Sequence, residues 1–269
     1  MKHNHKGFSL IEILIALTII ATLCAVGVSI SAETKKNARC VTEINAARNL
    51  ITAYLSHAAD NSGNVLPGYQ SDDNATNLDG QSLHHPVNAR YPWRLAPSLP
   101  KIEGVMLFNG NEQVLKDKNR DYLVSVRPNL GLNDVLVGGH FGTGSPLPPT
   151  PKMREAFGKF WLSNLSEASS PEKLIVFASS RLSTQETGYF EIRPPKLNKE
   201  VWSSAKFSSD RSADSFGFMD LRWKGKAVCA MLAGNVELLD DEPLRDMRRW
   251  SIQAQEANDR HFLIKYQSQ

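Results

Sequence analysis

The sequence predicts an α+β protein in which a long N-terminal helix packs on a C-terminal head built around an antiparallel sheet. Residues 8–30 form an almost uninterrupted apolar segment, and residues 31–60 continue with helical periodicity. Residues 61–269 then alternate short apolar runs with turn signals. We therefore expect a leader over residues 1–7, a membrane-spanning or core-forming helix over 8–30, an amphipathic continuation over 31–60 and a globular head over 61–269.

Composition excludes several classes of protein. The 269 residues are 41% hydrophobic and 22% charged, which is ordinary for a folded chain and argues against disorder, a collagen-like repeat or a polytopic membrane protein. The net charge of +3 is mild and no Lys/Arg block is present, so nucleic acid is not an expected partner. Three cysteines do not form a disulfide scaffold or a zinc pattern.

The apolar segment is long enough to cross a bilayer. From Phe8 to Ile30 it contains one charge, Glu12. A helix of this length spans roughly 34 Å, against about 30 Å for the hydrocarbon core. Lys2 and Lys6 precede it, which predicts a cytoplasmic leader, a single pass through the bacterial inner membrane and a periplasmic head.

Three interpretations of this segment differ in how they treat Glu12. A cleaved secretory signal would use the small residues Ser29 and Ser31, but the apolar run is too long for one. A plain anchor fits the length and leaves Glu12 unexplained, because an unpaired carboxylate inside a membrane costs a few kcal/mol. Cleavage between Gly7 and Phe8 would supply a partner, since the new α-amino group of Phe8 lies four residues from Glu12.

The residues from Lys6 to Glu12 read K-G-F-S-L-I-E and precede the apolar run. This segment resembles the class III signal of type IV pilins and of type II secretion pseudopilins. The resemblance implies cleavage after Gly7 by a membrane-embedded prepilin peptidase and N-methylation of Phe8. Glu12 takes the fifth mature position, where the family carries its characteristic glutamate, and the apolar helix is retained after processing.

The helix is expected to continue to about Ala59. Glycine and proline are absent from residues 28–61, and Gly63 supplies a stop signal. An apolar stripe at helical spacing is expected to pack on the head, while polar residues that include Glu43 occupy the other faces. The members of the stripe are Val41, Ile44, Ala47, Ile51, Tyr54 and Ala58.

The head is predicted from local patterns only. Strand-like runs occupy residues 105–108, 122–126, 134–137, 174–178, 189–192, 216–219, 227–232 and 236–239. Helices are expected over residues 152–165 and 242–257. Residues 138–151 carry four glycines and four prolines and are expected to form a loop.

A weaker resemblance concerns the C-terminal part. Many large-headed pseudopilin-like proteins end in a His-x9-Asp-Gly pattern followed by His-Val-Glu. In this chain Trp223 stands at the first His position, Ala233 at the Asp position and Asn235 at the second His position, while Gly234 remains. The chain therefore resembles a degenerate member of this group, with a strand–turn–strand skeleton and without the groups that could bind a metal.

No cofactor or metal is expected in the head. Major pseudopilins carry a calcium loop, and acidic pairs such as Asp72-Asp73 and Asp240-Asp241 offer an alternative of this kind, but the spacing of a calcium loop is missing. His84 and His85 are expected to be exposed loop residues. Cys40 and Cys229 would both be exported, and the sequence leaves open whether they form a disulfide.

The sequence thus predicts a structural, non-enzymatic protein. The resemblance implies a pilin-like subunit of a type II secretion pseudopilus or of a type IV pilus-like filament. Its implied partners are prepilin peptidase, other pilin or pseudopilin subunits, an inner-membrane assembly platform and membrane lipid. The alternative is a minor pilin whose large head binds secreted substrate, polysaccharide or DNA. No G-x-S-x-G nucleophile motif and no complete phosphate-binding loop supports an enzyme.

Overall fold

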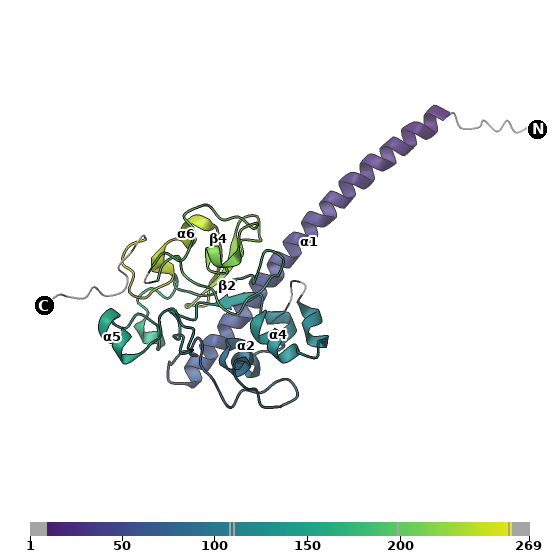
Figure 1. Cartoon of the computed structure of the whole chain (residues 1–269). Coiled ribbons are helices and arrows are strands. Elements are labelled where there is room, and N and C mark those ends of the chain that lie inside the picture. The colour runs from purple at the N-terminus through teal and green to yellow at the C-terminus, as the bar shows by residue number, and fades with distance from the viewer. Residues whose placement is uncertain (1–9, 108, 110, 198, 258, 260–269) are drawn as a thin grey trace, which may run out of the picture. The chain divides into compact units, whose positions relative to one another are not determined.

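The computed structural model describes residues 10–107, 109, 111–197, 199–257 and 259, with the backbone alone for residues 23–32 and 103. The chain divides into two compact units, Met1–Val41 and Thr42–Gln269. Helix α1 (Leu10–Asp60) belongs to both units (Figure 1). The helix expected from Phe8 to about Ala59 is confirmed over the described residues.

In the first unit, α1 exposes large apolar side chains along its first turns. Leu10 is 85% exposed and Ile11 65%. The hydroxyls of Thr18 and Thr22 donate to carbonyl oxygens one turn earlier, so these polar groups are satisfied within the helix. In the described part of the chain, no helix combines the length and apolar character needed to cross a membrane. The span expected over residues 8–30 stays a prediction.

In the second unit, the remainder of α1 contributes a buried stripe to the head. Ala47, Ile51, Tyr54 and Ala58 are fully buried, as expected. The start of the stripe was predicted wrongly, because Val41 is 56% exposed whereas Glu43 is fully buried. The buried stripe therefore begins at Glu43, whose carboxylate accepts hydrogen bonds from residues of the head.

The end of α1 is a left-handed turn. The carbonyl of Ala58 accepts hydrogen bonds from the backbone N–H groups of Asn61 and Gly63. Ser62 and Gly63 have positive φ angles of 57° and 83°. This geometry ends a helix, and it confirms the stop signal predicted at Gly63.

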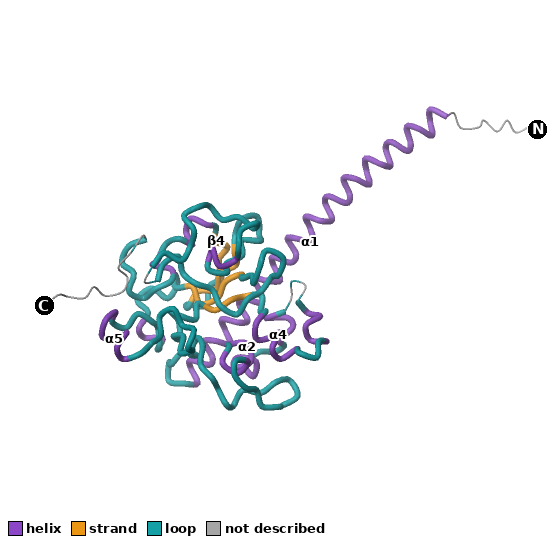
Figure 2. Tube along the Cα trace, in the orientation of Figure 1, coloured by secondary structure: helices purple, strands orange, loops and turns teal. Residues whose placement is uncertain are grey.

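The head contains one antiparallel sheet of four strands in the order β1-β2-β3-β4. The strands are β1 (Leu130–Leu132), β2 (Ile175–Ser179), β3 (Ala227–Met231) and β4 (Val236–Leu239). The last three confirm predicted strands, whereas β1 was not predicted. The strands lie inside the head and are surrounded by loops (Figure 2).

Two predicted strands are helices. Residues 105–108 overlap α3 (Ile102–Met106), and residues 122–126 lie in α4 (Arg120–Val126). A short apolar run does not distinguish a strand from a buried helical turn. In α4 the choice follows from tertiary contacts, because the Trp93 indole N–H donates to the Asp121 carbonyl at 2.7 Å.

Three other predicted strands form single bridges instead of extended ladders. In the runs 134–137, 189–192 and 216–219, the bridges are Val137 to Leu162, Glu191 to Leu132 and Met219 to Ser180. These runs are mostly buried, which explains their apolar pattern, but each pairs with another segment through a single isolated β-bridge. The prediction of extended strands at these places is wrong.

The two helices predicted in the second half of the head are shorter than expected. Helix α5 covers Pro151–Phe157 and ends before Gly158, whose φ is 67°, so the helix expected to reach residue 165 stops early. The helix expected over residues 242–257 is wrong: α6 covers Asp241–Leu244, and a 3-10 turn, η6, covers Met247–Arg249. The remaining short elements are η1 (Val87–Ala89), α2 (Tyr91–Leu95), η2 (Ala96–Ser98), η3 (Glu112–Lys116), η4 (Leu165–Glu167) and η5 (Ala213–Phe216).

The sheet separates two packed regions of the head. Phe177 of β2 contacts Tyr54 of α1 with ring centroids 5.5 Å apart. Ala227, Cys229 and Met231 of β3 belong instead to a core cluster with Trp250. Because alternate residues of a strand point to opposite faces, α1 covers one face and the C-terminal segments cover the other.

Cys40 and Cys229 are both thiols and do not form a disulfide with each other. Cys229 is fully buried in β3, and burial raises the pKa of its thiol. Cys40 is half-buried in α1.

Candidate functional sites

The residues predicted for processing lie at the edge of the described chain. Gly7 and Phe8 fall outside the described residues. Glu12 lies in the first turn of α1 and is exposed, with exposed apolar side chains on both sides of it. A negative charge in the first turn is favourable because the amino end of a helix carries a partial positive charge.

A second candidate site lies in the head and was not predicted. Asp134, His140 and Glu191 each offer one possible metal-ligating atom, and these atoms lie within 4.8 Å of one another. The three residues are 0%, 7% and 2% exposed. His140 Nδ1 is 2.7 Å from Asp134 Oδ2, a hydrogen-bond distance between a ring nitrogen and a carboxylate.

Two segments far apart in the sequence form this cluster: one carries Asp134 and His140, and the other carries Glu191. Asp134 follows β1, and its amide donates to the Leu132 carbonyl. Glu191 bridges to the same strand residue, because the Leu132 amide donates to the Phe190 carbonyl and the Ile192 amide donates to the Leu132 carbonyl. The end of β1 therefore positions both carboxylates.

A glycine turn positions His140. Gly138 and Gly139 both have a φ of 82°, a left-handed conformation that other residues rarely adopt. A Cβ on Gly138 would lie 2.3 Å from the Leu66 carbonyl oxygen, so a side chain has no room there. The turn presents the His140 ring to Tyr69, which stacks on it at 4.5 Å with an interplanar angle of 4°.

The electrostatics of the cluster are dominated by two neighbouring buried carboxylates, those of Asp134 and Glu191. Burial and the Asp134 charge raise the pKa of Glu191 well above its usual range, although Arg193 donates to Glu191 Oε1 at 2.7 Å. Burial lowers the pKa of His140, but the hydrogen bond to Asp134 and the two carboxylate charges outweigh it and leave that pKa raised. Asp134 Oδ1 is buried and has no hydrogen-bond partner.

A third group of residues attaches α1 to the sheet. The buried carboxylate of Glu43 accepts hydrogen bonds from Ser179 Oγ and from Asn109 Nδ2, and Arg222 Nε lies 3.9 Å from Glu43 Oε2. The Arg222 guanidinium also pairs with Asp220 at 3.2 Å. Helix α1, strand β2 and the segment before β3 are thus joined by one buried polar network.

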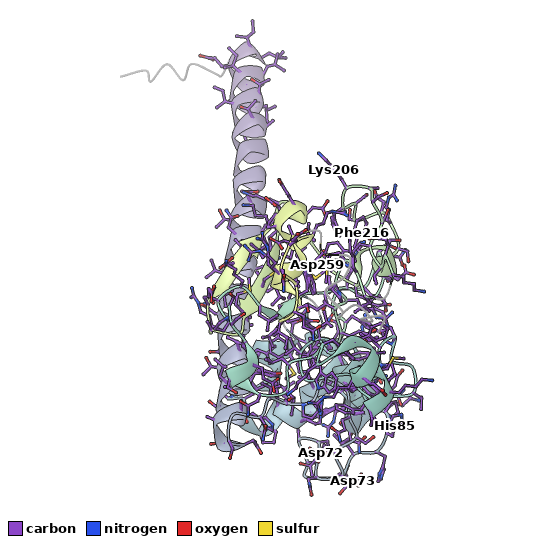
Figure 3. The ribbon with its side chains drawn as sticks, turned by 90° about the vertical axis from the view of Figure 1, so that its left-hand side faces the viewer. Asp72, Asp73, His85, Lys206, Phe216 and Asp259 are labelled. Carbon is purple, nitrogen blue, oxygen red and sulfur yellow. The ribbon has the colours of Figure 1, made fainter. Side chains whose placement is uncertain are left out.

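The acidic and histidine candidates predicted from the sequence lie in turns and ion pairs. Asp72, Asp73 and His85 lie toward one end of the head (Figure 3). Asp72 Oδ1 accepts the Asn74 amide at 2.9 Å, and His85 Nδ1 lies 3.2 Å from Ser71 Oγ.

The C-terminal acidic pair is also engaged within the protein. Asp241 pairs with Arg245 at 3.0 Å, which makes this part of the alternative calcium loop an ion pair of α6. The structure brings neither this pair nor Asp72 into the buried cluster around His140.

The segment that resembles the His-x9-Asp-Gly pattern forms the hairpin predicted for it. Ala233 and Gly234 lie in the turn between β3 and β4, where Gly234 has a φ of 90° and the Met231 amide donates to the Asn235 carbonyl. Trp223 precedes β3 and is buried. The strand–turn–strand skeleton is therefore present.

Comparison with known proteins adds one finding. Residues 2–28 match the family model described as the prokaryotic N-terminal methylation motif. No curated protein and no solved structure matches the chain. The matched segment contains Gly7, Phe8 and Glu12, so the N-terminus carries a prepilin-type motif that supports a type IV pilin-like or pseudopilin-like protein processed by prepilin peptidase.

Proposed function

We propose that this protein is a structural subunit of a type II secretion-type pseudopilus or a type IV pilus-like filament. Prepilin peptidase cleaves between Gly7 and Phe8, Phe8 is N-methylated, and the mature subunit assembles through α1. The methylation motif over residues 2–28 is the observation that carries this proposal. The proposal assigns no enzymatic activity to the head.

The surface of α1 supports assembly through this helix. Its first turns expose Leu10, Ile11, Ile13 and Leu14, each more than half accessible. A contiguous apolar surface of this kind marks a protein or membrane contact. In the proposed cycle the surface lies in inner-membrane lipid before assembly and against sister helices afterwards.

Glu12 sets the register of assembly in this proposal. Cleavage creates a cationic amine at Phe8, and the Glu12 carboxylate of a neighbouring subunit neutralises it. An unpaired charge in an apolar environment is costly, so only the stagger that pairs the two groups is stable.

Mass spectrometry of the protein from its native membrane tests the processing step. We expect an N-terminal peptide that begins at N-methylated Phe8. An intact N-terminus at Met1, or one near Ala32, would contradict the proposal, because the first indicates an unprocessed anchor and the second a cleaved secretory signal.

Replacement of Glu12 tests the assembly step. The E12A variant should remain in the membrane and be processed, but its incorporation into filaments should fall roughly tenfold or more, because the register-setting pair is lost. The matched control is E33A, which removes another exposed carboxylate of α1. Filaments are sheared from cells and quantified by immunoblot, and normal incorporation of E12A would refute the role of Glu12.

A further inference from the structure

We propose that Asp134, His140 and Glu191 form a binding site for a divalent metal ion of the zinc type. The site is independent of the N-terminal motif and lies wholly within the second unit. It would tie together the end of β1, the glycine turn at 138–139 and the segment around Glu191.

The distances fit an ion after side-chain movements of roughly 1 Å. Zinc binds imidazole nitrogen and carboxylate oxygen at about 2.0–2.2 Å, which separates neighbouring ligand atoms by roughly 3.0–3.5 Å. The candidate ligand atoms of the cluster lie within 4.8 Å of one another, and His140 Nδ1 and Asp134 Oδ2 are 2.7 Å apart. An ion would replace the hydrogen atom between these two atoms and separate them by a few tenths of an ångström.

An unpartnered carboxylate oxygen favours a cation at this site. Asp134 is fully buried, yet its Oδ1 accepts no hydrogen bond. Buried polar atoms are normally paired, so each exception requires an explanation. A metal ion bound by both oxygens of the Asp134 carboxylate would satisfy this oxygen, and it would also offset the repulsion between Asp134 and Glu191, which contributes to the raised pKa of Glu191.

The donor types favour a transition metal over calcium or magnesium. The cluster combines one imidazole with two carboxylates. Imidazole nitrogen suits zinc and its neighbours in the transition series, whereas calcium takes six to eight oxygen ligands and magnesium an octahedron of oxygens. Both ions prefer oxygen ligands, so the imidazole of His140 argues against them.

The surroundings hold the ligands in place. Tyr69 stacks on the His140 ring and fixes its plane. The Arg193 guanidinium donates to Glu191 at 2.7 Å and is partly exposed, so it can orient the carboxylate from outside the cluster. Such outer partners commonly orient metal-binding side chains and tune their affinity.

Zinc binding to the full chain tests the proposal. The purified protein in detergent is stripped with a chelator, and Zn²⁺ is titrated by calorimetry with metal content measured by mass spectrometry. We expect one tightly bound Zn²⁺ per chain, an increase in the thermal midpoint, and much weaker binding of Ca²⁺.

Matched variants locate the bound ion. E191Q and H140N should weaken binding roughly 100-fold or more, because E191Q neutralises a carboxylate ligand at constant size and H140N replaces the imidazole ligand with a shorter amide. E43Q is the control, since it changes an equally buried carboxylate outside the cluster and should bind like the wild type. Circular dichroism checks that each variant is folded.

Three outcomes would overturn the proposal. The first is absence of stoichiometric Zn²⁺ binding by the wild-type chain, which needs no variant to interpret. The second is wild-type affinity in E191Q and H140N, which would place the ion on surface histidines such as His84 and His85. The third is tighter binding of Ca²⁺ than of Zn²⁺.

Discussion

Glu43 shows how a single polar residue on an amphipathic helix can be part of the core. The sequence pattern places it on a polar face of the helix, yet it is fully buried. Ser179 and Asn109 donate hydrogen bonds to its carboxylate, and Arg222 lies nearby. The cost of burying the charge is offset by these donors, so the residue specifies where α1 meets β2.

Removal of this carboxylate should destabilise the head. The E43A variant leaves the Asn109 amide without its acceptor and removes a negative charge near Arg222, and we expect a loss of about 2–4 kcal/mol in the free energy of unfolding. The control N49A changes an exposed position of the same helix and should have little effect. Urea denaturation measures both, and equal stability of the two variants would show that the network does not stabilise α1 on the sheet.

At the scale of elements, glycines decide the path of the chain beside the buried cluster. Gly68 approaches the Asp134 backbone so closely that a Cβ would lie 2.1 Å from the Asp134 carbonyl oxygen. Gly138 lies equally close to the Leu66 carbonyl oxygen, and its φ angle is positive. The loop predicted from the glycines and prolines of residues 138–151 is thus present up to the start of α5, and its conformation depends on backbone contacts with residues 66–69.

The sheet also illustrates what defines an element in this head. Strands β2, β3 and β4 coincide with predicted runs, because each is a short, mainly apolar stretch bounded by turn residues. Strand β1 has only three residues and contains Gly131, which has low strand propensity. Its extended form follows from pairing with β2, a contact between residues far apart in the sequence.

At the scale of the whole molecule, α1 belongs to two units, and the exposure of its apolar side chains differs between them. Its Thr42–Asp60 part supplies fully buried side chains to the head, among them Leu50, Ile51 and Tyr54. Its first turns instead expose their apolar side chains. This division matches the proposed function, in which one part completes a fold and the other forms contacts between subunits.

Truncation should separate these two roles. Removal of residues 1–41 should leave a folded head, whereas removal of residues 1–60 should abolish cooperative unfolding. Burial of the Leu50, Ile51 and Tyr54 side chains stabilises the head by roughly 5–9 kcal/mol, which is comparable with the entire free energy of unfolding of a domain. Thermal denaturation monitored by near-ultraviolet circular dichroism distinguishes the two outcomes. A cooperative transition in the chain that lacks residues 1–60 would contradict this account.

The sequence by itself determined the long helix, its end near Gly63, the α+β class and the N-terminal motif, which is also the segment that matches a known family. These features depend on contiguous residues: apolar length, helical periodicity, a stop signal and a short signal around Gly7, Phe8 and Glu12. The hairpin at Gly234 was also predictable from contiguous residues, because one glycine between two apolar runs defines it.

Only the tertiary structure decided the buried cluster and the role of Glu43. Asp134 and His140 lie six residues apart in no recognised spacing, and Glu191 joins them only because its segment bridges to β1. The same holds for the helical form of residues 122–126, where tertiary contacts select one of two conformations open to a short apolar run. The physical reason is common to these cases, since partners distant in the sequence supply the hydrogen bonds and burial that fix each conformation, and no local pattern records them.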